Sequence, residues 1–264
     1  MFRVRSFTID DAYISYRYAR NLANGLGLVY NEGERIEGYT NFLWTLILAG
    51  GIRVGLDADG FAKVLGGGCA LGTLAFTYAI AARLRPLSLA PCIAPWLLAT
   101  SAVTSGYAVF GLETSLFVVL ILCGTWLFLR EEPQMTGDPA PSAASNGFPF
   151  SGVAFALAGL TRPEAPMFLG LLMLPLGFRF VGKKNLLRGA VFVAPIALHM
   201  LWRRSYYGTW LPNTLTAKTG DTDNQIAAGL DYVSKYADHA GPILWLSLIA
   251  LGIAFVERRR ALLA

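Results

Sequence analysis

Long apolar blocks separated by short polar segments set the pattern of this chain. Charge-free stretches at 64–82, 86–112 and 240–256 approach or exceed the roughly 20 residues that a helix needs to cross a bilayer. Several blocks contain Gly or Pro, which membrane helices tolerate better than soluble ones. The pattern therefore predicts an all-α, polytopic membrane protein. We expect seven transmembrane helices, at about 63–82, 87–104, 112–129, 149–161, 165–178, 189–202 and 241–256.

One apolar block is too short to cross. It runs from Phe42 to Ile52 and ends at Arg53, so we expect 42–56 to form a re-entrant or interfacial helix. If each of the seven later blocks crosses once, the Lys and Arg residues of their connections fall on one side, as in cytoplasmic loops. These residues are Arg83, Arg85, Arg130, Arg179, Lys183, Lys184, Arg188 and Arg258–Arg260. The opposite, extracytoplasmic side then holds residues 1–41, 106–113, 161–164 and 203–240.

Four segments follow from this count. Residues 1–41 form a first extracytoplasmic loop, and residues 42–130 form membrane helices. Residues 131–148 are rich in Pro and Ser, which is typical of a mobile linker, here on the cytoplasmic side. Residues 149–264 form further membrane helices with an outer loop at 203–240.

Composition agrees with this pattern. Of 264 residues, 55% are hydrophobic and only 15% are charged, and the mean hydropathy is +0.49, which excludes an ordinary water-soluble enzyme. A net charge of +5 would suggest nucleic acid in a soluble chain, but the basic residues lie at the ends of apolar blocks. No nucleic-acid partner is therefore expected. Cys69, Cys92 and Cys123 lack the spacing of a metal site or a disulfide framework.

The first loop contains a polar helix with two acids at its start. Helical spacing runs from Ala12 to Ala23, where the pair Asn24-Gly25 would end it, and places Tyr13, Arg17 and Arg20 on one face. Asp10 and Asp11 precede this stretch. One of these carboxylates could cap the helix while the other faces a cavity. The alternative is that both serve only the helix end.

Other polar residues are expected on the same outer side. Ionisable groups near hydrocarbon are costly, and those that are retained usually pair or line a polar cavity. Arg162 and Glu164 could simply neutralise each other across a turn shaped by Pro163, and Glu113 could be an interface acid. Arg203 and Arg204 break the positive-inside rule, and their guanidinium groups suit a lipid phosphate. The candidate substrate-binding residues are Arg17, Arg20, Glu37, Tyr39, Asn41, Glu113, Arg162, Glu164, Arg203, Arg204 and Asn213.

A family resemblance rests on these same residues. The run from Asp10 to Asn21, with Gly27–Asn31 and Glu37–Asn41, closely resembles the first outer loop of bacterial GT-C glycosyltransferases. Within that group the chain looks most similar to the terminal arabinofuranosyltransferases of mycobacterial cell walls. Three shorter runs also resemble recurring signatures of the family: Gly111–Thr114, Thr161–Glu164 and Tyr206–Asn213.

The resemblance implies a GT-C-like fold in a bacterial plasma membrane and an enzyme that uses a polyprenyl-phosphate sugar donor. The acceptor would be a cell-envelope glycan or glycolipid on the outer face. The essential acid would be an aspartate of the first outer loop, here Asp10 or Asp11. Such enzymes usually have a membrane helix before the aspartate pair, with more spans and an outer domain afterwards. The resemblance thus implies that this chain is a fragment of a longer protein or that its start has been placed too far downstream.

These features together suggest an inverting glycosyl transfer. One aspartate would take the proton of an acceptor hydroxyl, which attacks the anomeric carbon as the lipid phosphate departs. Arg17, Arg20, Arg162 or the pair Arg203-Arg204 would stabilise the departing charge. No organic cofactor is expected. A divalent cation that bridges Asp10 or Asp11, Glu113 and the phosphate is a secondary alternative, because hard oxygen ligands suit magnesium or manganese.

Two other classes of function stay open. A transporter or lipid flippase would place ionisable residues within its spans and use broken helices near the midplane, whereas here the charges cluster at one face. A non-catalytic membrane scaffold would not depend on either aspartate.

Overall fold

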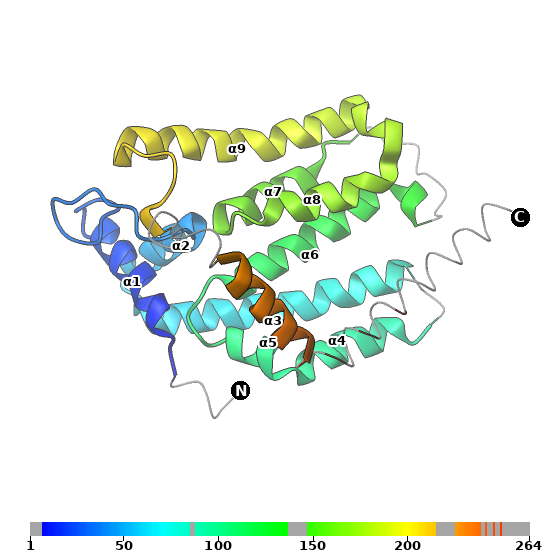
Figure 1. Ribbon diagram of the computed structural model, residues 1–264, viewed down its shortest axis with the longest axis horizontal. Coiled ribbons are helices and arrows are strands. Elements are labelled where there is room, and N and C mark those ends of the chain that lie inside the picture. The colour runs from blue at the N-terminus through cyan, green and yellow to red at the C-terminus, as the bar shows by residue number, and fades with distance from the viewer. Residues whose placement is uncertain are drawn as a thin grey trace, which may run out of the picture. The chain divides into compact units, whose positions relative to one another are not determined.

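The computed structural model describes residues 7–84, 88–136, 147–214 and 225–238, together with residues 241, 245 and 249. The chain forms two units, Met1–Thr214 and Leu215–Ala264. All regular elements described in the first unit are helices, as predicted, and residues 225–238 of the second unit are helical. The elements of the first unit (Figure 1) are α1 (Asp10–Ala23), α2 (Phe42–Arg53), α3 (Ala58–Leu84), α4 (Ala90–Thr100), α5 (Ala102–Tyr107), α6 (Thr114–Glu131), η1 (Pro133–Met135), α7 (Phe150–Thr161), α8 (Ala165–Met173), η3 (Leu174–Val181) and α9 (Lys183–Tyr207).

Three helices of the described residues, α3, α6 and α9, are long and apolar enough to cross a membrane. The apolar helices α2, α4, α7 and α8 are shorter. With 12 residues, α7 is about 18 Å long, well below the roughly 30 Å of a hydrocarbon core. Most of the crossing expected at 241–256 lies outside the described residues. The described part thus has three candidate spans, and the count of seven stays a prediction.

Two predicted helices are interrupted. The block at 87–104 divides into α4 and α5 at Ser101, whose backbone is extended and whose hydroxyl accepts a hydrogen bond from the Thr104 amide at 3.4 Å. The prediction of one continuous helix at 87–104 is therefore wrong, because Ser101 caps the start of a new helix. The block at 165–178 continues from α8 into the 3-10 helix η3. Pro175 lies at this change, and its ring nitrogen has no proton for an α-helical hydrogen bond.

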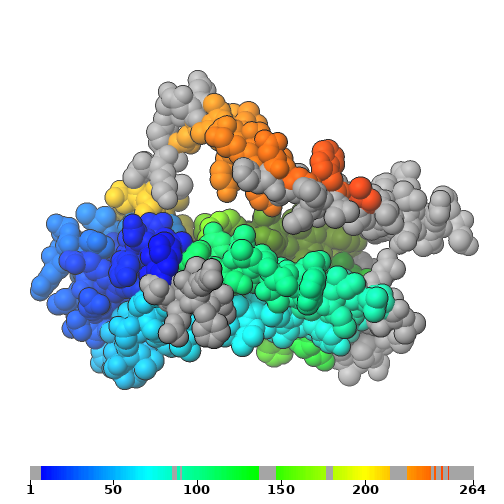
Figure 2. Space-filling view, turned by 90° about the horizontal axis from the view of Figure 1, so that it is seen from below, coloured from blue at the N-terminus to red at the C-terminus, as the bar shows by residue number. Residues whose placement is uncertain are grey.

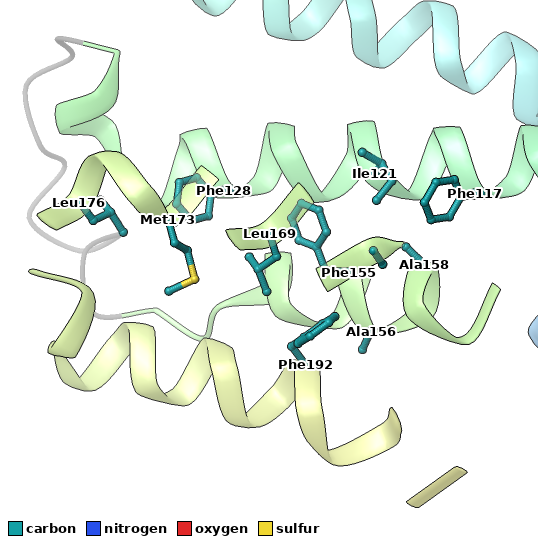
Figure 3. Packing of buried hydrophobic residues seen from close by; sticks show 11 residues of the cluster. Phe117, Ile121, Phe128, Phe155, Ala156, Ala158, Leu169, Met173, Leu176 and Phe192 are labelled. Carbon is teal, nitrogen blue, oxygen red and sulfur yellow. The ribbon is translucent and has the colours of Figure 1, made fainter. Parts of the chain in front are cut away.

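An apolar core joins α6 to α9. Phe117 and Phe128 of α6 pack with Phe155 of α7, Leu169 of α8 and Phe192 of α9 (Figure 3). Glycines leave room for side chains of the neighbouring helices: a Cβ on Gly124 would lie 2.8 Å from the Phe155 ring, and one on Gly159 would lie 2.6 Å from the Ile196 side chain. Small residues at such contacts are a common means of helix association in membranes.

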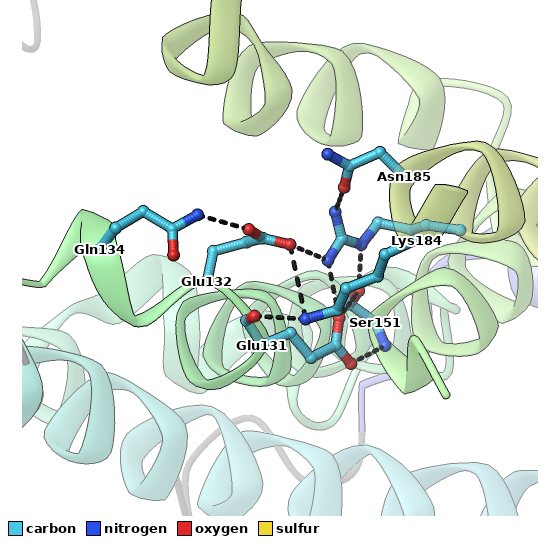
Figure 4. Close-up of polar contacts among 7 residues, drawn as sticks. Glu131, Glu132, Gln134, Ser151, Lys184 and Asn185 are labelled. Atoms are coloured by element: carbon cyan, nitrogen blue, oxygen red, sulfur yellow. Dashed lines mark hydrogen bonds and ion pairs between the residues drawn. The ribbon is translucent and has the colours of Figure 1, made fainter. Parts of the chain in front are cut away.

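A buried network of charges joins the C-terminal end of α6 to the starts of α7 and α9. Arg188 is fully buried and donates to Glu131 at 3.1 Å, to Glu132 at 2.7 Å and to Ser151 at 2.9 Å. Lys184 donates to the Glu131 carbonyl and lies 3.6 Å from the Glu132 carboxylate (Figure 4). Buried charges are tolerated when they are paired and hydrogen-bonded in this way. The expected linker thus begins with ordered residues at 131–136, and its residues 137–146 lie outside the described part.

The short helix α2 stays beside α1. Ser15 of α1 bonds Asn41 just before α2, and Arg53 at the end of α2 donates to the Ala23 carbonyl at 3.2 Å. The chain then starts α3 beside α1, where the hydroxyl of Tyr16 donates to Asp59 at 3.3 Å. The non-crossing course of 42–56 stays a prediction. The blue N-terminal residues gather at one end of the first unit, from which α3 extends away (Figure 2).

Candidate functional site

The helix α1 begins at the acidic pair and ends where the sequence predicts. It runs from Asp10 to Ala23, and Asn24 occupies its C-cap position. The N-cap position belongs to Ile9, whose side chain makes no capping bond, so neither aspartate caps the helix. Asp10 and Asp11 lie instead in the first turn, where negative charge is favourable beside the helix dipole.

Both aspartates are exposed, and neither makes a hydrogen bond or ion pair with the residues that the structure describes. The buried face of α1 includes Ala12, Ser15 and Ala19. Because residues four apart lie on one face of a helix, Asp11 lies one turn before Ser15, on the edge of the buried face. Asp10 is instead in line with the exposed residues Tyr13 and Arg17. The two acids therefore face different surroundings.

A buried amide links α1 to the start of α6. The Asn41 side chain donates to Ser15 at 3.0 Å and to Glu113 at 2.9 Å, and it accepts from Thr45 at 3.1 Å. We call the hydrogen-bonded group Ser15, Asn41, Thr45, Glu113, Arg162 and Glu164 the Asn41 network. Both N–H donors and the oxygen acceptor of the Asn41 side chain are therefore satisfied, as a buried polar group requires.

Arg162 extends the Asn41 network to the surface. Its Nη1 donates to Glu113 at 3.1 Å, and its Nη2 donates to Glu164 at 3.0 Å. Pro163 explains this placement: a residue before proline is driven into an extended conformation, and Arg162 has φ −150° and ψ 142°. The helix α7 therefore ends at Thr161, and the arginine side chain can turn back toward α6.

The charges of Arg162 and Glu164 stabilise each other. Hydrogen bonding to Glu164 raises the pKa of Arg162, and the charge of Glu113 adds to this. Partial burial would raise the pKa of Glu164, but hydrogen bonding and the charge of Arg162 outweigh it and lower that pKa. Both groups are thus ionised at neutral pH. The predicted neutralisation of this pair is present, and Glu113 shares the same cation.

A second group of predicted residues fastens the loop at 24–41, here named the strap, to the end of α9. Glu37 is buried, and its Oε2 lies 2.9 Å from Nε of Arg203. The backbone N–H of Asn213 donates to the backbone carbonyl of Glu37 at 3.0 Å. Burial raises the pKa of Glu37, although the charge and hydrogen bond of Arg203 oppose that rise. Arg203, which the predicted topology places outside against the positive-inside rule, thus has a buried structural partner. Arg204 is exposed, with its guanidinium 6.0 Å from the Trp210 ring.

Tyrosines complete the attachment of the strap. The hydroxyls of Tyr39 and Tyr207 lie 3.3 Å apart, and Tyr207 donates to the Leu28 carbonyl at 2.6 Å. Tyr18 donates to the Ile36 carbonyl at 2.7 Å and accepts from the Gly38 amide at 2.8 Å. Burial also raises the pKa of Tyr39, so this hydroxyl stays protonated. Neither Tyr18 nor Tyr207 is among the predicted site residues, although Tyr18 lies in the run Asp10–Asn21 and Tyr207 in the run Tyr206–Asn213 that carry the family resemblance.

The predicted site residues thus meet in two groups along α1. Asn41, Glu113, Arg162 and Glu164 join α1 at Ser15, whereas Glu37, Tyr39, Arg203 and Asn213 join it through the strap near Tyr18. Arg17 donates to the Tyr30 carbonyl at 2.8 Å and is therefore engaged with the strap, while Arg20 is exposed on the same face of α1. Among the described residues, no three His, Cys, Asp or Glu side chains form a group that could hold a metal ion.

Comparison with known proteins gives this geometry a context. The chain is similar to two terminal β-(1→2)-arabinofuranosyltransferases. It is 28% identical to the protein of Mycobacterium tuberculosis over 97% of this chain and 42% of that protein. It is 30% identical to that of Corynebacterium glutamicum over 94% of this chain and 38% of that protein.

The predicted resemblance to terminal arabinofuranosyltransferases is confirmed by these matches. The chain spans about two fifths of the length of the curated relatives it matches. No family model matches the chain. No solved structure matches it either.

We predict that Gly111→Ala destabilises the protein more than Gly33→Ala. Both glycines have positive φ, 82° and 83°, which costs an alanine about 1–2 kcal/mol. A Cβ on Gly111 would in addition lie 2.1 Å from the Tyr16 hydroxyl, whereas one on Gly33 meets nothing within 4 Å. Thermal unfolding in detergent measures the difference. Adding Tyr16→Phe should recover part of the loss at Gly111; equal losses for both glycine variants would contradict the steric argument.

We predict that Arg203→Met is strongly destabilising near neutral pH and less so in acid. Removing the cation leaves the buried Glu37 carboxylate unpaired, at a cost of about 3–5 kcal/mol. A carboxyl whose pKa is raised takes up a proton as pH falls and then needs no cation, so the penalty shrinks. Unfolding midpoints at about pH 8 and about pH 5 test this sign. The exposed neighbour gives the control Arg204→Met, and a pH-independent penalty for Arg203→Met would count against the explanation.

Proposed function

We propose that the chain belongs to a membrane glycosyltransferase that moves a sugar from a polyprenyl-phosphate donor to an extracytoplasmic glycan or lipid acceptor. The names of the two relatives and the extent of the match support this. The observation that carries it is a pair of exposed aspartates that have no hydrogen bond or ion pair with the described residues, beside a polar network that reaches the surface at Arg162. An exposed carboxylate beside such a cluster can come within hydrogen-bond reach of a bound hydroxyl.

Asp11 is the better placed general base of the two. It lies one turn before Ser15, which is buried and fixed by Asn41, whereas Asp10 lies on the exposed side of α1. In the proposed reaction Asp11 accepts the proton of the acceptor hydroxyl. The hydroxyl oxygen then forms a bond to the anomeric carbon while the bond from that carbon to the phosphate oxygen breaks. The phosphate keeps the electron pair, and the configuration of the sugar inverts.

The cations divide into two roles in this proposal. Arg203 and Glu37 hold the strap, because both are buried and paired with each other. Arg20, Arg162 and Arg204 reach solvent and are candidates to meet the negative charge of the donor. Arg17 contributes by fixing the strap through Tyr30.

Mutation of the two aspartates tests the reaction. Asp11→Asn should lower sugar transfer by a factor of about 10² to 10⁴, the usual worth of a general base, and Asp10→Asn should have a smaller effect. The assay measures transfer from a panel of polyprenyl-phosphate sugars in membranes that contain the chain, alone and extended by its flanking coding sequence. Glu32→Gln, an exposed acid of the strap, is the matched control. Full transfer in both aspartate variants would contradict the proposal and favour a scaffold or transporter.

We also propose a multi-pass plasma-membrane protein with seven crossings and residues 1–41 outside. Support comes from the grouping of the predicted outer residues Asn41, Glu113 and Arg162 at the end of the first unit where α6 begins. Lys184 and Arg188 lie at the other end of α6.

Cysteine labelling tests this topology in a variant whose native cysteines are replaced. A membrane-impermeant maleimide added to intact cells should modify Glu32→Cys, an exposed position in the strap. Lys183→Cys, equally exposed at the start of α9, should react only after the membrane is opened. The reverse pattern would overturn both the orientation and the outer location of the aspartates.

A further inference from the structure

The guanidinium of Arg162 has an inner and an outer side. On the inner side its Nη1 meets Glu113, whose side chain is only 11% exposed and is also held by Asn41. On the outer side Nη2 and Nε meet the two oxygens of Glu164 at 3.0 and 3.4 Å, and the Glu164 side chain is 46% exposed. The inner contact is thus fixed by the fold, and the outer one lies open to solvent.

The outer contact has the geometry of an oxyanion site. Two roughly parallel N–H donors of one guanidinium edge face two oxygens of one anion, the arrangement in which arginine binds carboxylate and phosphate alike. The edge is held in place from three directions. Pro163 sets the backbone of Arg162, Glu113 holds Nη1, and the Phe117 ring lies 5.9 Å from the guanidinium carbon.

Glu164 is a weak occupant of this edge. It is two residues from Arg162 in the chain and about half exposed, and solvent-exposed ion pairs contribute little to stability. Among the described side chains its carboxylate bonds only Arg162, so a rotation into solvent would break only this pair. Glu113 could not do so, because it is buried and shares Asn41.

We propose that the outer edge of Arg162 binds the phosphate of the lipid-linked sugar donor, and that Glu164 occupies this edge only until the donor displaces it. The inference rests on the proposed function and deepens it. As the sugar leaves, the donor phosphate changes from a monoanionic diester to a dianionic monoester. Arg162 therefore binds the departing phosphate more strongly than the intact donor, which lowers the barrier.

The proposal gives opposite signs for substitutions of Glu164 and of Arg162. Glu164→Gln removes a charged competitor and should tighten the binding of polyprenyl monophosphate by about two- to five-fold, the worth of one exposed ion pair. Arg162→Lys keeps a positive charge for Glu113 but loses the two-pronged edge, and should weaken binding by about ten-fold. The control Glu34→Gln removes an exposed carboxylate of the strap that bonds Asn31 and should leave binding unchanged.

The experiment titrates polyprenyl monophosphate against the full chain in nanodiscs of zwitterionic lipid and follows the unfolding midpoint. An ion pair with a purely structural role would make Glu164→Gln less stable and would not improve phosphate binding. Binding by Glu164→Gln that equals or falls below that of the unmodified chain would overturn the proposal. Glu164 is exposed, so this variant stays informative even if Arg162→Lys does not fold.

Sugar transfer separates this proposal from the proposed function. If binding follows the predicted signs but no sugar is transferred, the phosphate site stands and the enzyme assignment fails. If transfer occurs and the donor KM is the same in the unmodified chain, Glu164→Gln and Arg162→Lys, the enzyme assignment stands and the phosphate site fails.

Discussion

The candidate site depends on one buried amide. The Asn41 side chain donates to Ser15 of α1 and to Glu113 directly before α6, and it accepts from Thr45 of α2. The bond to Ser15 fixes the position of α1 against α2, and the bond to Glu113 fixes the start of α6. Arg162 then has a defined partner on which to turn outward. An unmet hydrogen bond at such a position costs about 1–3 kcal/mol, so the helices keep this register.

The strap applies the same principle on the other side of α1. A loop that runs over a membrane protein must satisfy its own backbone groups, and here tyrosine hydroxyls do much of that work at Leu28, Ile36 and Gly38. The pairing of Glu37 with Arg203 adds a charged bond that is costly to bury and more costly to break. Such a bond favours one arrangement of the strap over others more than it adds to stability.

Local features of the fold could be predicted from the sequence, and long-range pairings could not. The end of α1 at Asn24 follows from helix-stop signals, and the grouping of Glu113 with Arg162 on one side follows from counting apolar blocks. The bond between Asn41 and Glu113 joins residues 72 positions apart, and no periodicity marks it. Ser101 was missed for a different reason: a serine inside an apolar block gives no sign of whether it faces a neighbour or starts a new helix.

The two polar networks at the ends of α6 also define the length of the apolar segment between them. Between Glu113 and Glu131 the helix rises about 27 Å, close to the roughly 30 Å of a bilayer's hydrocarbon core. If α6 crosses the membrane, as proposed, moving either end into the hydrocarbon core would carry charged groups out of contact with water, which is costly. A mismatch between the length of α6 and the thickness of the hydrocarbon core would then affect both networks. In a thinner membrane we expect the helix to tilt.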